Sequence, residues 1–168
     1  MMTTAAEQIE RLATLPDHSR VWVYQANREL NDEEVHRIES AAQEFLKEWN
    51  AHGAKMSAKL VVIYQRFVVL AANESAVLAS GCSIDSSVRF LKSLQDSIGI
   101  DLFDRMNLAY RNDAGEITTL KLPEFQEAIS KGAITKETIV FNNLVDSLGD
   151  LRTKWEVPAS GSWHLRMF

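Results

Sequence analysis

The residues best suited to chemistry lie at positions 79–89, in the sequence ASGCSIDSSVR. Small, polar and glycine residues lead here directly into an amphipathic pattern, which predicts that a helix begins in this stretch. A helix N-terminus offers unpaired backbone N–H groups and the positive end of the helix dipole. It therefore suits a phosphate or carboxylate, or a nucleophilic cysteine, because the thiolate form is favoured there.

Three interpretations of this stretch stay open. In the structural one, Asp85 or Ser83 caps the helix and Cys82 is a small buried residue. In the second, the turn binds a small anion, and the C-terminal aromatic residues help to wall the site. The ligand-binding residues are then Gly81, Ser83, Asp85, Ser86, Arg89 and Trp163. In the third, catalytic one, Cys82 is a nucleophile and His52 or His164 is its base.

Known signatures of phosphate and metal chemistry are missing. Six residues separate Cys82 from Arg89, a longer spacing than cysteine-dependent phosphatases use. Neither G-x-x-x-x-G-K-[ST] nor G-x-G-x-x-G occurs, so no nucleotide-binding loop is predicted. The four histidines are scattered along the sequence, and the single cysteine cannot form a metal-binding pair of cysteines. We expect no metal site and no cofactor.

Composition narrows the class of protein. The chain has 168 residues, 46% of them hydrophobic, which is enough for one domain with an ordinary core. With 18 basic and 23 acidic residues the net charge is −5, which disfavours nucleic acid as a partner. The apolar runs are too short to cross a bilayer, and charges interrupt the N-terminal segment where a secretory signal would be apolar. We expect a cytoplasmic protein with no membrane insertion.

The elements that must position the candidate residues follow from hydrophobic periodicity. In residues 20–122, strand and helix patterns alternate in the order βαββαββ. Strands are expected at 20–27, 59–72, 106–111 and 116–122, and helices at 31–53 and 86–98. Segment 59–72 is long for one strand, so we interpret it as a hairpin broken near Gln65, although no Gly, Asn or Pro marks a turn there. The order predicts an antiparallel ferredoxin-like βαββαβ sheet extended by a hairpin strand.

The chain ends are expected to complete a single α+β domain over residues 1–168. A helix is predicted within residues 1–16, and helices and an aromatic tail within residues 123–168. Because the strands are apolar on both faces, the C-terminal helices should cover the face of the sheet that the two middle helices leave bare. One of them is predicted at 135–149, capped by Thr135. The tail holds two of the four tryptophans and should pack on its own domain.

Two further features involve polar residues. Asn142 and Asn143 interrupt an apolar pattern, which indicates that they brace a polar site or a turn. The predicted helix at 31–53 carries most of the net charge. Its carboxylates are Asp32, Glu33, Glu34, Glu39, Glu44 and Glu48, opposed by Arg37 and Lys47. This acidic surface is either a solvated helix face or a docking face.

Several segments together resemble a bacterial family. They are SRVWVYQANR (19–28), GCSID (81–85), VRF (88–90), TIVFNNLV (138–145), WEVPA (155–159) and SWH (162–164), and they span almost the whole chain. Members of this family have no established activity but often carry the label "ABC transporter ATPase". An ATPase needs a phosphate-cradling loop with a lysine, and no lysine follows a glycine cluster here, so the residues predict no ATPase activity.

Three function classes follow from these observations. The leading prediction is a soluble binding or interaction module, whose partner is a small anion held at the helix start after Gly81 or another protein. The alternative is a small thiol-dependent enzyme with Cys82 as nucleophile. The third is a structural homodimer built on a sheet edge or on the aromatic tail.

Overall fold

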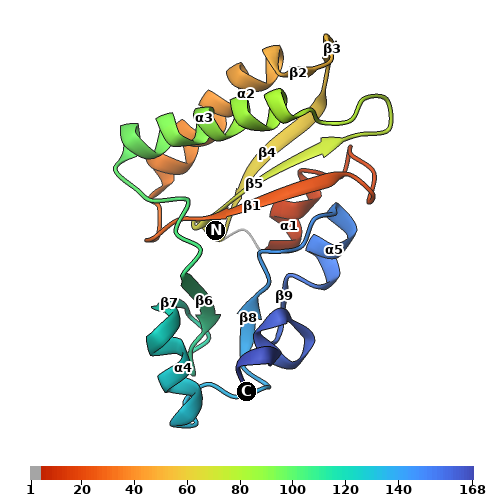
Figure 1. Ribbon diagram of the computed structural model, residues 1–168. Coiled ribbons are helices and arrows are strands. Elements are labelled where there is room, and N and C mark those ends of the chain that lie inside the picture. Colours follow the sequence, from red (N-terminus) through yellow and green to blue (C-terminus); the bar gives the residue numbers. More distant parts are fainter. Residues whose placement is uncertain (1–4) are drawn as a thin grey trace.

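The first sheet has three antiparallel strands. In the computed structural model, which describes residues 5–168, they are β1 (Arg20–Gln25), β4 (Ser57–Ile63) and β5 (Phe67–Asn73), in the order β1-β5-β4 (Figure 1). Strands β4 and β5 pair in register from Ser57↔Asn73 to Ile63↔Phe67. The predicted hairpin within residues 59–72 is therefore confirmed, with its turn at 64–66.

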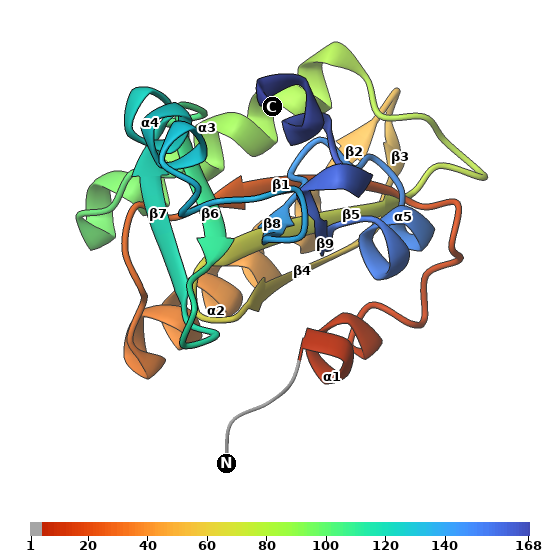
Figure 2. The same ribbon diagram turned by 90° about the horizontal axis from the view of Figure 1, so that it is seen from below.

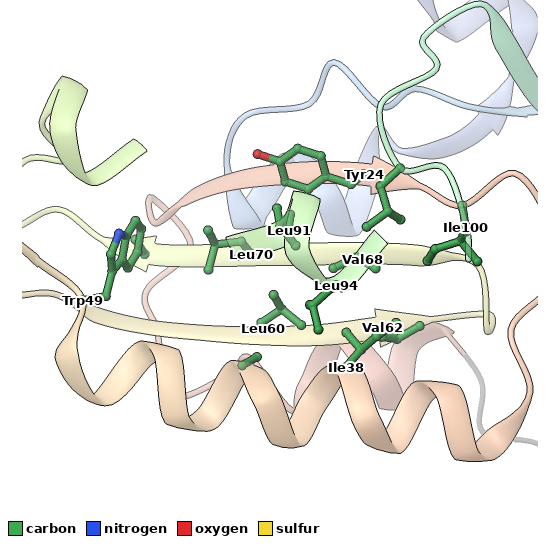
Figure 3. Close-up of a cluster of buried hydrophobic side chains, with 14 of the residues drawn as sticks. Tyr24, Ile38, Trp49, Leu60, Val62, Val68, Leu70, Leu91, Leu94 and Ile100 are labelled. Carbon is green, nitrogen blue, oxygen red and sulfur yellow. The ribbon is translucent and has the colours of Figure 1, made fainter. Parts of the chain in front are cut away.

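Two long helices cover one face of this sheet. They are α2 (Asp32–Glu48) and α3 (Gly81–Ile98), and Figure 1 shows them side by side above the strands. Because side chains alternate along a strand, one face of β4 and β5 presents the even-numbered residues to the helices. Figure 3 shows this core, in which Ile38 of α2 and Leu91 of α3 are fully buried against Leu60, Val62 and other strand residues.

The opposite face is covered by segments from both ends of the chain. Helices α1 (Ala5–Glu10) and α5 (Leu148–Thr153) lie on this side of the sheet (Figure 2). Ile9 of α1 and Leu148 of α5 are buried against the sheet together with Trp155. The expected cover by C-terminal helices is thus provided by α5 and shared with the N-terminal segment. Part of the predicted helix at 1–16 lies outside the described residues.

A second antiparallel sheet occupies the lower half of Figure 1. Its strands are β6 (Asn107–Arg111), β7 (Ile117–Lys121), β8 (Ile139–Phe141) and β9 (Glu156–Pro158), in the order β7-β6-β8-β9. Helix α4 (Leu122–Ser130) and the short helices η1 (Ala159–Gly161) and η2 (Trp163–Met167) pack on it. Strands β2 (Asn50–Ala51) and β3 (Ala54–Lys55) form a small separate hairpin. The aromatic tail therefore packs on its own domain, as predicted.

The α+β class with antiparallel sheets is confirmed, but the single ferredoxin-like sheet is not. The chain follows the expected order from β1 to α3, and then β6 joins the second sheet instead of the first. The outer edge of β1 is occupied by residues 146–148. Val21 N–H donates to the carbonyl of Asp146 at 3.0 Å, and Arg20 forms a bridge with Ser147. A later segment thus takes the place expected for β6.

Three predicted boundaries are corrected. The helix predicted at 135–149 is wrong, because residues 139–141 form β8 between β6 and β9, as their β-branched and aromatic side chains favour. Helix α2 ends at Glu48, and Gly53 instead turns the β2–β3 hairpin with φ 78°. Helix α3 begins at Gly81, five residues before the predicted start.

Candidate functional site

The start of α3 is capped by Ser80 rather than by Asp85 or Ser83. The Ser83 N–H donates to Ser80 Oγ at 3.1 Å, and the Ser80 N–H donates to Ser83 Oγ at 2.8 Å. This capping box is a local motif that satisfies two backbone donors of the first turn. Cys82 follows the cap and is exposed, so the interpretation of Cys82 as a small buried residue is wrong.

A groove of about 440 Å³ lies beside this helix start. Its walls come from the end of α2, the β2–β3 hairpin and the first turn of α3. The residues that line it are Glu44, Phe45, Glu48, Trp49, Asn50, His52, Ser80, Cys82, Ser83 and Ser86. Trp49 links the end of α2 to the start of α3, because its Nε1 donates to the Ser83 carbonyl at 2.8 Å. The structure thus brings Cys82 and His52, far apart in the sequence, into one groove.

The other predicted site residues are only partly gathered there. Asp85 and Arg89 are exposed on α3 and do not line the groove. Gly81 is exposed, and a Cβ added to it would meet nothing within 4 Å. The two carboxylates in the groove, Glu44 and Glu48, repel an anion. The arrangement around Cys82 therefore favours a neutral or cationic group more than the anion that the sequence predicted.

His164 and Trp163 lie elsewhere, in the second sheet's core. His164 is 1% exposed, its Nδ1 lies 2.7 Å from Ser162 Oγ, and its ring stacks on Trp163. Burial lowers the pKa of His164 to about 4, so its imidazole is neutral at neutral pH. Trp163 lines a small pocket of about 80 Å³ with Gln25 and Asn143, instead of lining the start of α3. His164 and Trp163 thus take no part in the groove of Cys82.

Asn143 does brace a polar site, as its sequence position indicated. Its Nδ2 donates to Gln25 Oε1 at 3.0 Å, and its Oδ1 accepts from Trp155 Nε1 at 3.0 Å. Gln25 in turn donates to the Asn107 carbonyl at 2.9 Å. The chain of hydrogen bonds joins β1 to the second sheet, and because each amide is satisfied it serves to hold the two sheets together.

The strongest backbone anomaly is the turn between β4 and β5. Tyr64 and Gln65 have φ 56° and 54°, in the left-handed region, and the Arg66 N–H closes the turn onto the Ile63 carbonyl at 3.1 Å. Consecutive left-handed residues usually include glycine or asparagine, because other side chains are strained there. Such strain persists only where the surroundings hold it, and it gathers at ligand sites. No turn signal in the sequence points to this place.

Hydrogen bonds from three segments hold the hairpin tip, which is residues 64–66. The Tyr64 N–H donates to Gln8 Oε1 at 2.9 Å. The carbonyls of Gln65 and Arg66 each accept a backbone N–H, from Leu30 and Ala26, at 2.7 Å. These contacts fix the backbone from which the Arg66 side chain projects.

The Tyr64 side chain anchors the tip to the second sheet. Its ring stacks on Trp155 with centroids 6.0 Å apart, and its hydroxyl donates to Glu156 Oε1 at 2.5 Å. Arg111 Nε donates to the other oxygen of Glu156 at 2.8 Å, and its guanidinium lies over the Tyr64 ring. Burial and then the hydrogen bond to Glu156 raise the pKa of Tyr64 to about 12, so the phenol stays protonated at neutral pH.

The hairpin tip borders an open cleft of about 870 Å³. Its lining residues are Gln8, Arg11, Glu29, Asp32, Val35, Val62, Tyr64, Gln65, Arg66, Arg111, Gly115, Glu116 and Ile117. Two of its three arginines are engaged, because Arg11 pairs with Glu39 and Arg111 with Glu156. The half-buried guanidinium of Arg66 has no ion pair or hydrogen bond within residues 5–168. Burial lowers its pKa, and the nearby charge of Glu29 offsets only part of this effect. Arg66 is the functional candidate that sequence reasoning missed.

Comparison with known proteins adds no relative, since no protein-family model, curated protein or solved structure matches this chain. The resemblance to the bacterial family in the sequence stays a prediction. No helix among the described residues is long and apolar enough to cross a membrane. Within the same residues, no three His, Cys, Asp or Glu side chains gather as a metal site would need.

Proposed function

We propose that this protein is a non-catalytic binding module that holds a small anion on Arg66, in the cleft at the hairpin tip. The observation that carries the proposal is a half-buried guanidinium without an ion pair or hydrogen bond among residues 5–168, on a strained turn that surrounding segments hold in place. The proposed ligand class is the one that the sequence indicated. The proposed binding site, however, is the turn between β4 and β5 and not the start of α3.

The energetics of Arg66 favour this assignment. A guanidinium withdrawn from water loses solvation, which a planar carboxylate or a phosphate restores through two parallel charge-assisted hydrogen bonds. Because the backbone at 64–66 is already fixed, a ligand would not have to order it on binding, and pre-organisation of this kind increases affinity. The strain of the left-handed residues is then a cost of folding and not of binding.

The rest of the lining limits the kind of anion. Val35 and Ile117 offer apolar contact, whereas Glu29, Asp32 and Glu116 place three negative charges around the cleft. A polyanion such as ATP would be repelled by these carboxylates. The cleft therefore suits a small carboxylate or monophosphate with a compact apolar body, including one that also carries an amino group.

Thermal unfolding against a ligand panel tests the proposal. The panel contains inorganic phosphate, short aliphatic carboxylates, amino acids and Mg·ATP. A ligand at a hundred times its Kd stabilises by about 2.7 kcal/mol, or roughly 5–10 °C in Tm for a chain of this size. We expect a shift with a small monoanion that Arg66→Gln abolishes and Arg89→Gln leaves intact.

The matched pair of variants separates the two places for the anion. A shift lost in Arg89→Gln and kept in Arg66→Gln would return the site to the start of α3. A shift with Mg·ATP would contradict the exclusion of polyanions, and no shift with any member of the panel would refute a small-anion site.

A thiol-dependent enzyme is the second candidate, favoured by the meeting of Cys82 and His52 in one groove. Its test is the rate of alkylation of Cys82 by iodoacetamide at neutral pH. An activated thiol reacts faster than free cysteine, and His52→Asn should remove the excess rate. Asparagine is the matched replacement because it tolerates the left-handed φ of 53° at this position. A rate equal to that of free cysteine would end this candidate.

A further inference from the structure

The outer edge of β4 carries an inference that is independent of the Arg66 cleft. Because β4 is the last strand in the order β1-β5-β4, one side of its backbone is not paired with another strand (Figure 2). The N–H of Val62 points to that side, since it donates to Glu39 Oε2 at 2.9 Å. The backbone N–H and C=O groups of successive residues point to opposite edges of a strand. Those of Leu60 and Ala58 therefore also point to the unpaired side.

The two ends of this edge differ. Side chains cover the end near the hairpin, where Val62 and Tyr64 donate to Glu39 and Gln8. Within residues 5–168, no side chain or other strand donates to or accepts from the outward backbone groups of Ala58 and Leu60. We call this part of β4 the free end of the sheet. The backbone groups of Ala58 and Leu60 are two residues apart, which is the spacing that pairing with another strand requires.

A groove of about 810 Å³ runs along this free end, between β4 and α2. Its apolar lining comes from Ala42 and Leu46 of α2 and from Met56 and Leu60. Its charged residues are Arg11, Lys47, Lys55, Lys59 and Glu39. Arg11 pairs with Glu39 and Lys47 pairs with Glu44, so Lys55 and Lys59 leave a surplus of two positive charges. The chain as a whole has a net charge of −5. The free edge is therefore a basic groove in an acidic protein.

We propose that this edge groove binds an acidic, extended segment of another protein, which adds to the sheet as a strand beside β4. Backbone hydrogen bonds at Ala58 and Leu60 would supply affinity, and the basic side chains would select the partner by charge. A second copy of this chain is the poorer occupant, because edge-to-edge pairing would place one basic groove against another. Lysine at a strand edge acts against self-pairing in this way.

The geometry also specifies the sequence pattern of the partner. Successive side chains of an added strand point to opposite faces. On one face they meet the apolar side chains of α2, including Leu46, and on the other they meet Lys59, whose Nζ lies 3.5 Å from the Arg11 carbonyl. The segment should therefore alternate apolar and acidic residues over about five positions, the length of strand that Ser57–Val61 can pair with.

Fluorescence anisotropy with a labelled peptide tests the proposal. The probe is a peptide of about seven residues that alternates valine and glutamate, long enough to span the free edge. We expect it to bind the wild-type chain, and we expect the double substitution Lys55→Glu and Lys59→Glu to weaken binding by about tenfold or more. A valine–lysine peptide should show the opposite preference. Equal binding of both peptides by both proteins would overturn the proposal.

Two further variants keep the test independent of folding and of the proposed anion site. Ala58→Pro removes one outward N–H and leaves the pairing with β5 in place, so it should weaken binding, while Ala58→Gly should bind as the wild type does. Arg66→Gln should not change peptide affinity, because Arg66 lies outside this groove. If sedimentation shows a wild-type dimer that Ala58→Pro dissociates, the occupant is a second copy and the proposal fails.

Discussion

Acid sensitivity of folding should depend on the buried imidazole of His164. This side chain is 1% exposed, and burial lowers its pKa from 6.5 to about 4. In the unfolded chain the same imidazole titrates near its ordinary value, so between pH 6.5 and 4 the unfolded state binds the extra proton. The folded state is therefore fully favoured above pH 6.5 and loses stability as the pH falls towards 4.

The size of this effect follows from the shift. A difference of about 2.5 pKa units corresponds to about 3 kcal/mol at pH values below 4, of which about 2 kcal/mol is already lost at pH 5. That is a large share of the 5–15 kcal/mol that typically separates folded from unfolded domains. The packing of His164 between Trp163 and Phe125 of α4 is then sensitive to acid in this pH range.

Urea unfolding at a series of pH values between 4.5 and 7.5 measures the effect. The variant His164→Asn has no imidazole at this position but keeps a polar group near Ser162. Between pH 7.5 and 5 it should lose about 2 kcal/mol less than the wild type. His36→Asn, at an exposed histidine, is the control for loss of an imidazole as such. Parallel pH profiles for wild type and His164→Asn would refute the reasoning.

Two further predictions concern the hairpin tip and the start of α3. Tyr64→Phe removes the hydroxyl that donates to Glu156 and should lower the free energy of unfolding by about 1–2 kcal/mol; an unchanged urea midpoint would show that this bond adds nothing. Ser80→Ala removes the helix cap and should cost about 1 kcal/mol, with Ser93→Ala, an exposed serine inside the same helix, as the comparison. Equal losses in both serine variants would contradict the role of the cap.

Local signals in the sequence located several elements correctly. Helix α2 was predicted from hydrophobic periodicity at 31–53, and the structure shows that it begins with a capping box of Asn31 and Glu34. The strands predicted at 106–111 and 116–122 pair as the β6–β7 hairpin, and its short loop includes Gly115 with φ 79°. Each of these features depends on residues a few positions apart, which is the range over which capping and turn preferences act.

Sheet membership depended on contacts between distant segments. Residues 139–141 carry an apolar pattern that fits a helix or a strand, and their pairing with β6 and β9 makes them β8. Similarly, β6 joins the second sheet because residues 146–148 occupy the edge of β1. Strand pairing of this kind is a property of the partner segment as much as of the strand, so periodicity within the strand does not reveal it.

The candidate sites divide in the same way. Residue type and spacing were enough to place Cys82 at the start of a helix, whereas the meeting of Cys82 with His52 came from the packing of the β2–β3 hairpin beside α3. Nothing in residues 64–66 marks a turn. The turn forms because bonds from Gln8, Leu30 and Ala26 and the anchoring of Tyr64 outweigh the strain of two left-handed residues. Arg66 becomes a candidate site only because this turn forms, since its burial and its lack of an ion pair among residues 5–168 are set by segments far away in the chain.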